Sequence, residues 1–149
     1  MDGAAIRARR ERQGRHLVEA EVFNGKLSPG GLVDLEYRVQ ALQIWHGKVH
    51  PELRTTNTWD ALKSLARLQI IDAETFQRLN DAYSFIRNVI ESLRMVRGDA
   101  RDLAIPAAQS TDFESLARRL GYGGNWQRLQ DDLARHVQSV SESVRSVFP

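Results

Sequence analysis

The sequence predicts an all-α fold, a helical bundle of about six helices. Long segments repeat apolar residues at alternating spacings of three and four, and polar capping residues precede several of the helical segments. The chain has 149 residues, 42% of them hydrophobic and none of them cysteine, so one domain can bury a core without disulfides. We expect the bundle over residues 21–149, after a basic helix over residues 1–20.

The predicted first helix carries a cluster of arginines that includes Arg9, Arg10 and Arg12. Its few apolar residues form no continuous stripe, so this helix cannot bury much surface by itself. The simpler interpretation is a solvated basic face. The sharper one is a surface that docks on something absent from this chain.

The stretch SPGGLVDLEYRVQ, residues 28–40, could be a strand or a helix. Strict alternation from Val33 suggests a strand, which would place Asp34 and Glu36 side by side like the magnesium ligands of a nucleotidyltransferase. However, the apolar pattern continues to Trp45 without a turn signal before Gly47, which is too long for an ordinary strand. We therefore predict a helix with two apolar faces, in which the two carboxylates point about 200° apart and cannot share an ion.

The residues around the start of this helix have local explanations. Gly30 and Gly31 suit the tight turn that brings a loop into a helix, and we favour that turn over a phosphate site because the Gly-Lys-Ser/Thr ending of a P-loop is missing. Asp34 lies in the first turn, where the helix dipole favours a carboxylate. Glu36 shares a polar seam with Gln40, so it is the better candidate for a partly buried polar contact.

Four further helices follow along the chain. A short helix fits TWDALKSLARLQ, and a long core helix runs from Asp72, its predicted N-cap, to about residue 97. In TDFESLARRLG, Thr111 and Glu114 have the spacing of a capping box and Gly121 the place of a C-terminal cap. A last long helix begins after the predicted cap Asn125.

The sequence offers little support for catalysis or a metal site. His46 and His50 have the spacing of a helical metal-binding pair, but no third ligand is apparent and Gly47 and Pro51 weaken the helix there. No Gly-x-Ser-x-Gly turn is present. The net charge of only +2 argues against nucleic acid as a partner, and no apolar run is long enough for a membrane. We expect a cytoplasmic setting, because cysteine and a hydrophobic leader are both missing.

At KLSPGGLVDLEYRVQ the chain closely resembles the helical domain that follows the nucleotidyltransferase domain in bacterial glutamine synthetase adenylyltransferases, also called glutamate-ammonia ligase adenylyltransferases. The segments IRARRER, HPELRTTNTWDALKSLARLQIID, LNDAYSFIRNVIESLRMV and RGDARDLAIP occur in the order of that family. A related Gly-Gly-x-x-Asp element follows the nucleotidyltransferase domain of PII uridylyltransferases. The continuation Glu36-Tyr37 looks more like the adenylyltransferase form.

The resemblance implies a family domain without its catalytic domain, either as an excised piece or as a truncated gene product. Family catalytic domains carry a Gly-Ser followed by an Asp-x-Asp pair, and this chain has no Gly-Ser dipeptide. The first helix would then be a connector. ATP and magnesium are implied only for the missing domain, with no cofactor within this chain.

The function implied is a non-catalytic regulatory or scaffold role in AMP transfer to, or removal from, glutamine synthetase. The implied partners are the nucleotidyltransferase domain, glutamine synthetase and, as a third candidate, the PII signal protein. A stand-alone adaptor and the equivalent uridylyltransferase domain remain alternatives. The candidate contact residues are Gly30, Gly31, Asp34, Glu36 and Gln40, followed by Arg9, Arg10 and Arg12.

Overall fold

The computed structural model describes residues 4, 24, 30–98, 104–108 and 110–147. Its helices are α2 (Leu32–His46), the short 3-10 helix η1 (Pro51–Leu53), α3 (Thr58–Arg67), α4 (Ala73–Arg97), α5 (Thr111–Arg119) and α6 (Trp126–Val147). The predicted all-α class is confirmed, while the described part of the chain contains five α-helices where about six were expected. The predicted helix over residues 1–20 lies outside the described residues apart from Ala4.

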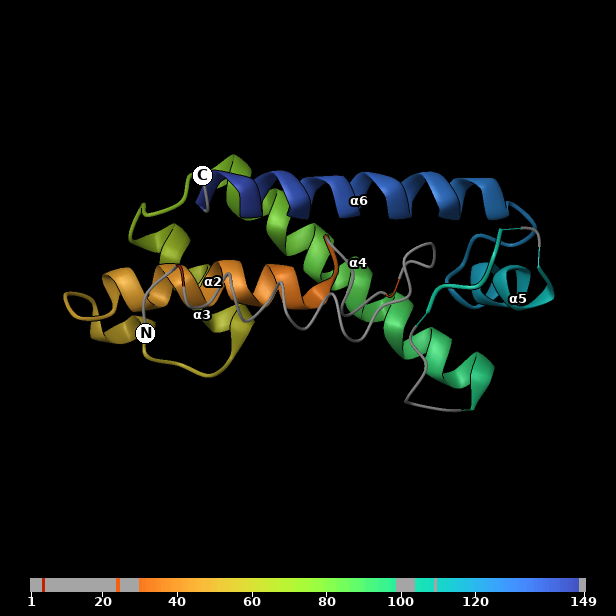
Figure 1. The fold of residues 1–149 in the computed structure, drawn as a ribbon, viewed down its shortest axis with the longest axis horizontal. Helices are drawn as coiled ribbons and strands as arrows, with labels where there is room; N and C mark the ends of the chain where they lie inside the picture. Colours follow the sequence, from red (N-terminus) through yellow and green to blue (C-terminus); the bar gives the residue numbers. More distant parts are fainter. Residues whose placement is uncertain (1–3, 5–23, 25–29, 99–103, 109, 148–149) are drawn as a thin grey trace.

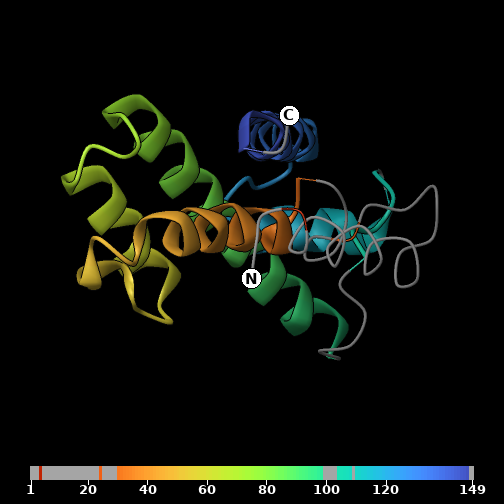
Figure 2. The ribbon, with the colours of Figure 1, turned by 60° about the vertical axis from the view of Figure 1, so that its left-hand side comes forward.

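Helix α4 is the centre of the bundle. It packs against α2, α3, α5 and α6, and Figure 1 shows it crossing diagonally between α2 and α6. It shares one core with α2, α3 and Val140 of α6, and another with α5 and the start of α6. Turned by 60°, α6 is seen nearly end-on above α2 (Figure 2). A long helix with apolar residues on more than one side can serve both cores at once.

Helix α2 confirms the helical interpretation of the opening stretch. It buries Leu35, Val39 and Leu42 against α3, α4 and α6, and it ends where Gly47 N donates to Gln43 O at 2.7 Å. The predicted second buried face is only partly present, since Ile44 is 41% exposed. Periodicity reveals an apolar face but does not say which neighbour covers it.

Two of the three N-terminal helix caps that the sequence predicts are confirmed. Asp72 Oδ1 accepts a hydrogen bond from Thr75 N at 2.7 Å, and Asn125 Oδ1 accepts one from Arg128 N at 3.2 Å. The predicted cap Thr111 is wrong by one position, because Ser110 Oγ accepts the bond from Phe113 N at 3.1 Å. Two adjacent hydroxyls can both fill this role, and the extended backbone of Ser110 decides between them.

The end of α5 confirms the predicted glycine cap. Gly121 has a φ of +88°, Tyr122 N donates to Ala117 O at 2.9 Å, and Gly121 N donates to Arg118 O at 3.1 Å. These two bonds form a Schellman motif, which satisfies the last carbonyls of the helix. Tyr122 OH then donates to Asp132 Oδ2 at 2.6 Å, which ties the turn after α5 to α6.

Candidate domain-contact site

The start of α2 is held from within the domain. Gly30 has a φ of +80°, and its N–H donates to Asp34 Oδ2 at 2.6 Å in a buried setting. A Cβ at this glycine would lie 2.5 Å from Val137 O and 2.7 Å from Ser141 Oγ, both on α6. Gly30 is therefore needed for its positive φ and also for the close approach of α6.

The structure separates the predicted contact residues into two groups. Gly30, Gly31 and Asp34 are buried, and for Gly30 and Asp34 the contacts inside the domain are a sufficient reason for their identity. Glu36 is half-buried and Gln40 is exposed, which leaves these two able to reach another domain. The arginines at positions 9, 10 and 12 lie outside the described residues, and a contact role for any of these positions stays a prediction.

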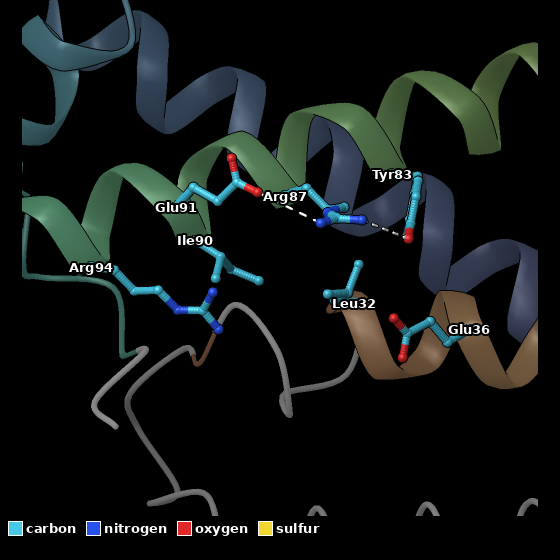
Figure 3. Close-up of a pocket in the computed structure, with 7 residues that line it drawn as sticks. All are labelled: Leu32, Glu36, Tyr83, Arg87, Ile90, Glu91 and Arg94. Atoms are coloured by element: carbon cyan, nitrogen blue, oxygen red, sulfur yellow. Dashed lines mark hydrogen bonds and ion pairs between the residues drawn. The ribbon is translucent and has the colours of Figure 1, made fainter. Parts of the chain in front are cut away.

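Glu36 lies at a pocket of about 230 Å³ between α2 and α4. Figure 3 shows Leu32 and Glu36 on α2 facing Arg87 and Arg94 on α4 across this space. The remaining lining residues are Tyr83, Ile90 and Glu91. We call this the α2–α4 pocket. Its mixture of two arginines, two glutamates and apolar side chains suits a protein surface with polar and charged groups.

Arg87 makes several contacts at the α2–α4 pocket. Its Nη1 donates to Tyr83 Oη at 3.3 Å, and its Nη2 lies 3.6 Å from Glu91 Oε1. The guanidinium also lies 5.6 Å from the centre of the Tyr83 ring and 5.9 Å from that of Trp59. The hydrogen bond with Tyr83, aided by Glu91, raises the pKa of Arg87. These contacts hold a cation in a defined position at the pocket.

Sequence reasoning did not single out the α4 side of this pocket. The core periodicity of α4 drew attention to its apolar residues, although Tyr83, Arg87 and Glu91 follow one another at intervals of four. That spacing places their side chains on one helix face, so the series could have been identified from the sequence. Its position opposite Glu36 could not be predicted from the sequence, because it depends on how α2 packs against α4.

The structure adds nothing to the case for a metal site. His46 ends α2, and its carbonyl accepts a backbone hydrogen bond from His50 N at 3.0 Å. Among the described residues, no group of three or more histidine, cysteine, aspartate or glutamate side chains could hold a metal ion. Within the same part of the chain, no helix has the length and apolarity to cross a membrane.

His136 occupies an environment that its sequence neighbours do not suggest. It is only 9% exposed and stacks on Phe85 of α4, with ring centres 4.4 Å apart. Burial lowers the pKa of His136, and the nearby Arg135 lowers it further, while Asp132 and Asp81 oppose the shift. The polar residues beside His136 in the sequence gave no sign of this aromatic contact.

We expect His136 to make the stability of the domain depend on pH. Its pKa is lower in the folded state than the value of about 6.5 in an unfolded chain, so the unfolded state binds the proton more tightly. The free energy of unfolding should therefore fall as the pH drops through this region. Urea unfolding at a series of pH values should show less of this loss in His136→Leu, and identical pH profiles would contradict the prediction.

The sequence of the chain is similar to a known family and to several curated proteins. Residues 4–148 match the family described as GlnD PII-uridylyltransferase. The chain is 36% identical over 124 residues to the bifunctional glutamine synthetase adenylyltransferase/adenylyl-removing enzyme of Cutibacterium acnes, covering 83% of this chain. The enzymes of the same name from Xanthomonas campestris strain B100 and Rhodopseudomonas palustris are 40% and 30% identical, over 78% and 91% of this chain. The chain spans only 12–13% of the length of these relatives.

Proposed function

The chain belongs to the GlnD PII-uridylyltransferase family, and from this membership we propose that it is a non-catalytic helical domain of a glutamine synthetase adenylyltransferase-type nucleotidyltransferase. The observation that carries the proposal is the 30–40% identity to segments of bifunctional adenylyltransferase/adenylyl-removing enzymes across most of the chain. In a complete enzyme the domain would act as a scaffold and regulator. It would pack against the nucleotidyltransferase domain and position it for AMP transfer to, or removal from, glutamine synthetase.

The α2–α4 pocket is our candidate for the contact with the nucleotidyltransferase domain. Among the described members of the predicted set, Glu36 and Gln40 are the ones that are not buried, and Glu36 faces Arg87 across the pocket. Charged groups around a recess give an interface its orientation and partner choice. The ATP and magnesium needed for AMP transfer would belong to the nucleotidyltransferase domain.

We expect Glu36→Ala to weaken binding of this chain to a separately produced adenylyltransferase nucleotidyltransferase domain about tenfold, as for other central interface residues. Surface plasmon resonance or calorimetry would measure the change. Because Glu36 is half-buried rather than part of the core, the variant should keep its helical circular dichroism.

The matched control is Glu52→Ala, which removes an exposed glutamate from η1 and should leave the affinity unchanged. Equal affinities of the wild type and Glu36→Ala would place the contact elsewhere. Failure of the wild type to bind any nucleotidyltransferase domain would remove the scaffold proposal and favour a stand-alone adaptor.

The second candidate is the equivalent domain of a PII uridylyltransferase, which the description of the matched family favours. The two candidates differ in the partner expected. Pull-down with the nucleotidyltransferase domains of both enzyme types would separate them, because the proposed role requires preference for the adenylyltransferase domain. Reversal of that preference would decide for the uridylyltransferase.

A further inference from the structure

A second pocket lies on α2, α4 and α6, away from the predicted contact residues. It has a volume of about 240 Å³ and is lined by Arg38, Thr75, Arg78, Leu79, Ser139, Glu142 and Ser143. Six of these seven side chains are polar or charged. They come from three helices that are far apart in the sequence, so the pocket exists only in the assembled bundle.

Arg38 is the most informative residue of this pocket. It is half-buried, and its Nε donates to Ser143 Oγ at 3.1 Å, a neutral partner on α6. Desolvation by burial lowers the pKa of Arg38 to about 10, so the guanidinium is still charged at neutral pH. Within the described part of the chain no ion pair with a carboxylate offsets this burial. An arginine with a planar array of donors and no acidic partner is suited to an incoming anion.

The other charged groups of the pocket leave it positive. Arg78 supplies a second guanidinium, and its ion pair with Glu74 is long, 4.0 Å between Nη2 and Oε1, and largely exposed. Glu142 is the single acidic lining residue, is exposed, and accepts a hydrogen bond from Gln138 Nε2 at 3.0 Å. The lining therefore carries two arginines and one glutamate. The hydroxyls of Thr75 and Ser139 add neutral donors, the kind that commonly surrounds phosphate oxygens.

We propose that this pocket binds a small tetrahedral oxyanion, a phosphate or a phosphate group of a small molecule, through Arg38 and Arg78. The volume of about 240 Å³ is enough for phosphate itself. Because the lining comes from α2, α4 and α6, a bound anion would join these three helices and stabilise their packing. The proposal goes beyond the scaffold role and does not depend on it.

Titration of the complete 149-residue chain with inorganic phosphate at constant ionic strength tests this inference. Calorimetry should show saturable binding, and the thermal unfolding midpoint should rise with phosphate but not with an equivalent amount of chloride. Arg78→Gln should weaken phosphate binding at least about tenfold, the scale of one lost charge-assisted hydrogen bond. Arg38→Gln should do the same, and Arg38→Lys, which keeps the charge but loses the planar donors, should weaken it less.

The control is Arg119→Gln, an exposed arginine on α5, which should bind phosphate like the wild type. Because Arg78 is largely exposed, its replacement reports on binding even if the Arg38 variants unfold. A second titration with ATP distinguishes free phosphate from a nucleotide phosphate as the preferred ligand. No saturable binding by the wild type, or equal weakening in Arg119→Gln, would overturn the proposal. Neither outcome would affect the scaffold role, because that role is measured by binding to the nucleotidyltransferase domain.

Discussion

Gly30→Ala is expected to lower the free energy of unfolding by about 2–5 kcal/mol. A left-handed backbone costs an alanine about 1–2 kcal/mol, and forcing an extra carbon into a packed site costs about 1–3 kcal/mol. Both apply here, because the φ is +80° and the new Cβ would lie 2.5 Å from Val137 O and 2.6 Å from Val137 Cγ1. Urea unfolding followed by circular dichroism would measure the change.

Gly121→Ala is the matched control for this substitution. Its φ of +88° is nearly the same, but apart from its chain neighbours no atom of the described residues lies within 4 Å of the position of its Cβ. It should therefore show the backbone cost alone, about 1–2 kcal/mol. The excess in Gly30→Ala is the cost of separating the start of α2 from α6. Equal losses in the two variants would show that α6 relaxes without cost and that the close approach is unimportant.

Asp34→Ala is expected to cost about 1–4 kcal/mol of the free energy of unfolding. The carboxylate is 3% exposed, and its Oδ2 accepts the hydrogen bond from Gly30 N at 2.6 Å. Removing an acceptor from a buried N–H costs about 1–3 kcal/mol, and a carboxylate in the first turn of a helix adds about 0.3–1 kcal/mol. Chemical unfolding of the wild type and the variant in the same buffer would measure the difference.

Asp34→Asn serves as the control because it keeps an oxygen acceptor for Gly30 N and removes the charge. It should retain more than half of the stability that Asp34→Ala loses. If the two variants are equally unstable, the negative charge rather than the hydrogen bond to Gly30 stabilises the start of α2. The comparison therefore separates the contribution of the negative charge of Asp34 from that of its hydrogen bond to Gly30 N.

The fold could be predicted because its helices are local in origin. The spacing of apolar residues predicts α4 and α6, and the single polar residues Asp72 and Asn125 cap them where expected. The continuation of the pattern to Trp45 correctly distinguished a helix from a strand at α2. Where two neighbouring residues could do the same job, as Ser110 and Thr111 can, the prediction missed by one position.

The candidate sites were predicted less completely, because each joins residues that are distant in the chain. The row of polar residues on α2 identified Glu36 as a candidate polar contact, but it did not predict that Glu36 lies opposite Arg87. Arg38 and Ser143 are 105 positions apart, and only the packing of α6 on α2 brings them to 3.1 Å. His136 has polar sequence neighbours yet stacks on Phe85 for the same reason.

The sequence by itself determined the all-α class, the course of the described helices and the turn at Gly30, since backbone preferences and apolar periodicity act over a few residues. The tertiary structure alone decided that Gly30 lies against Val137 and that Asp34, in the first turn of α2, is buried. Helix positions relative to one another follow from how side chains of separate helices interdigitate. Gly30 and Asp34 therefore hold the start of α2 in place from within the domain, while a contact role for Glu36 and Gln40 stays a prediction.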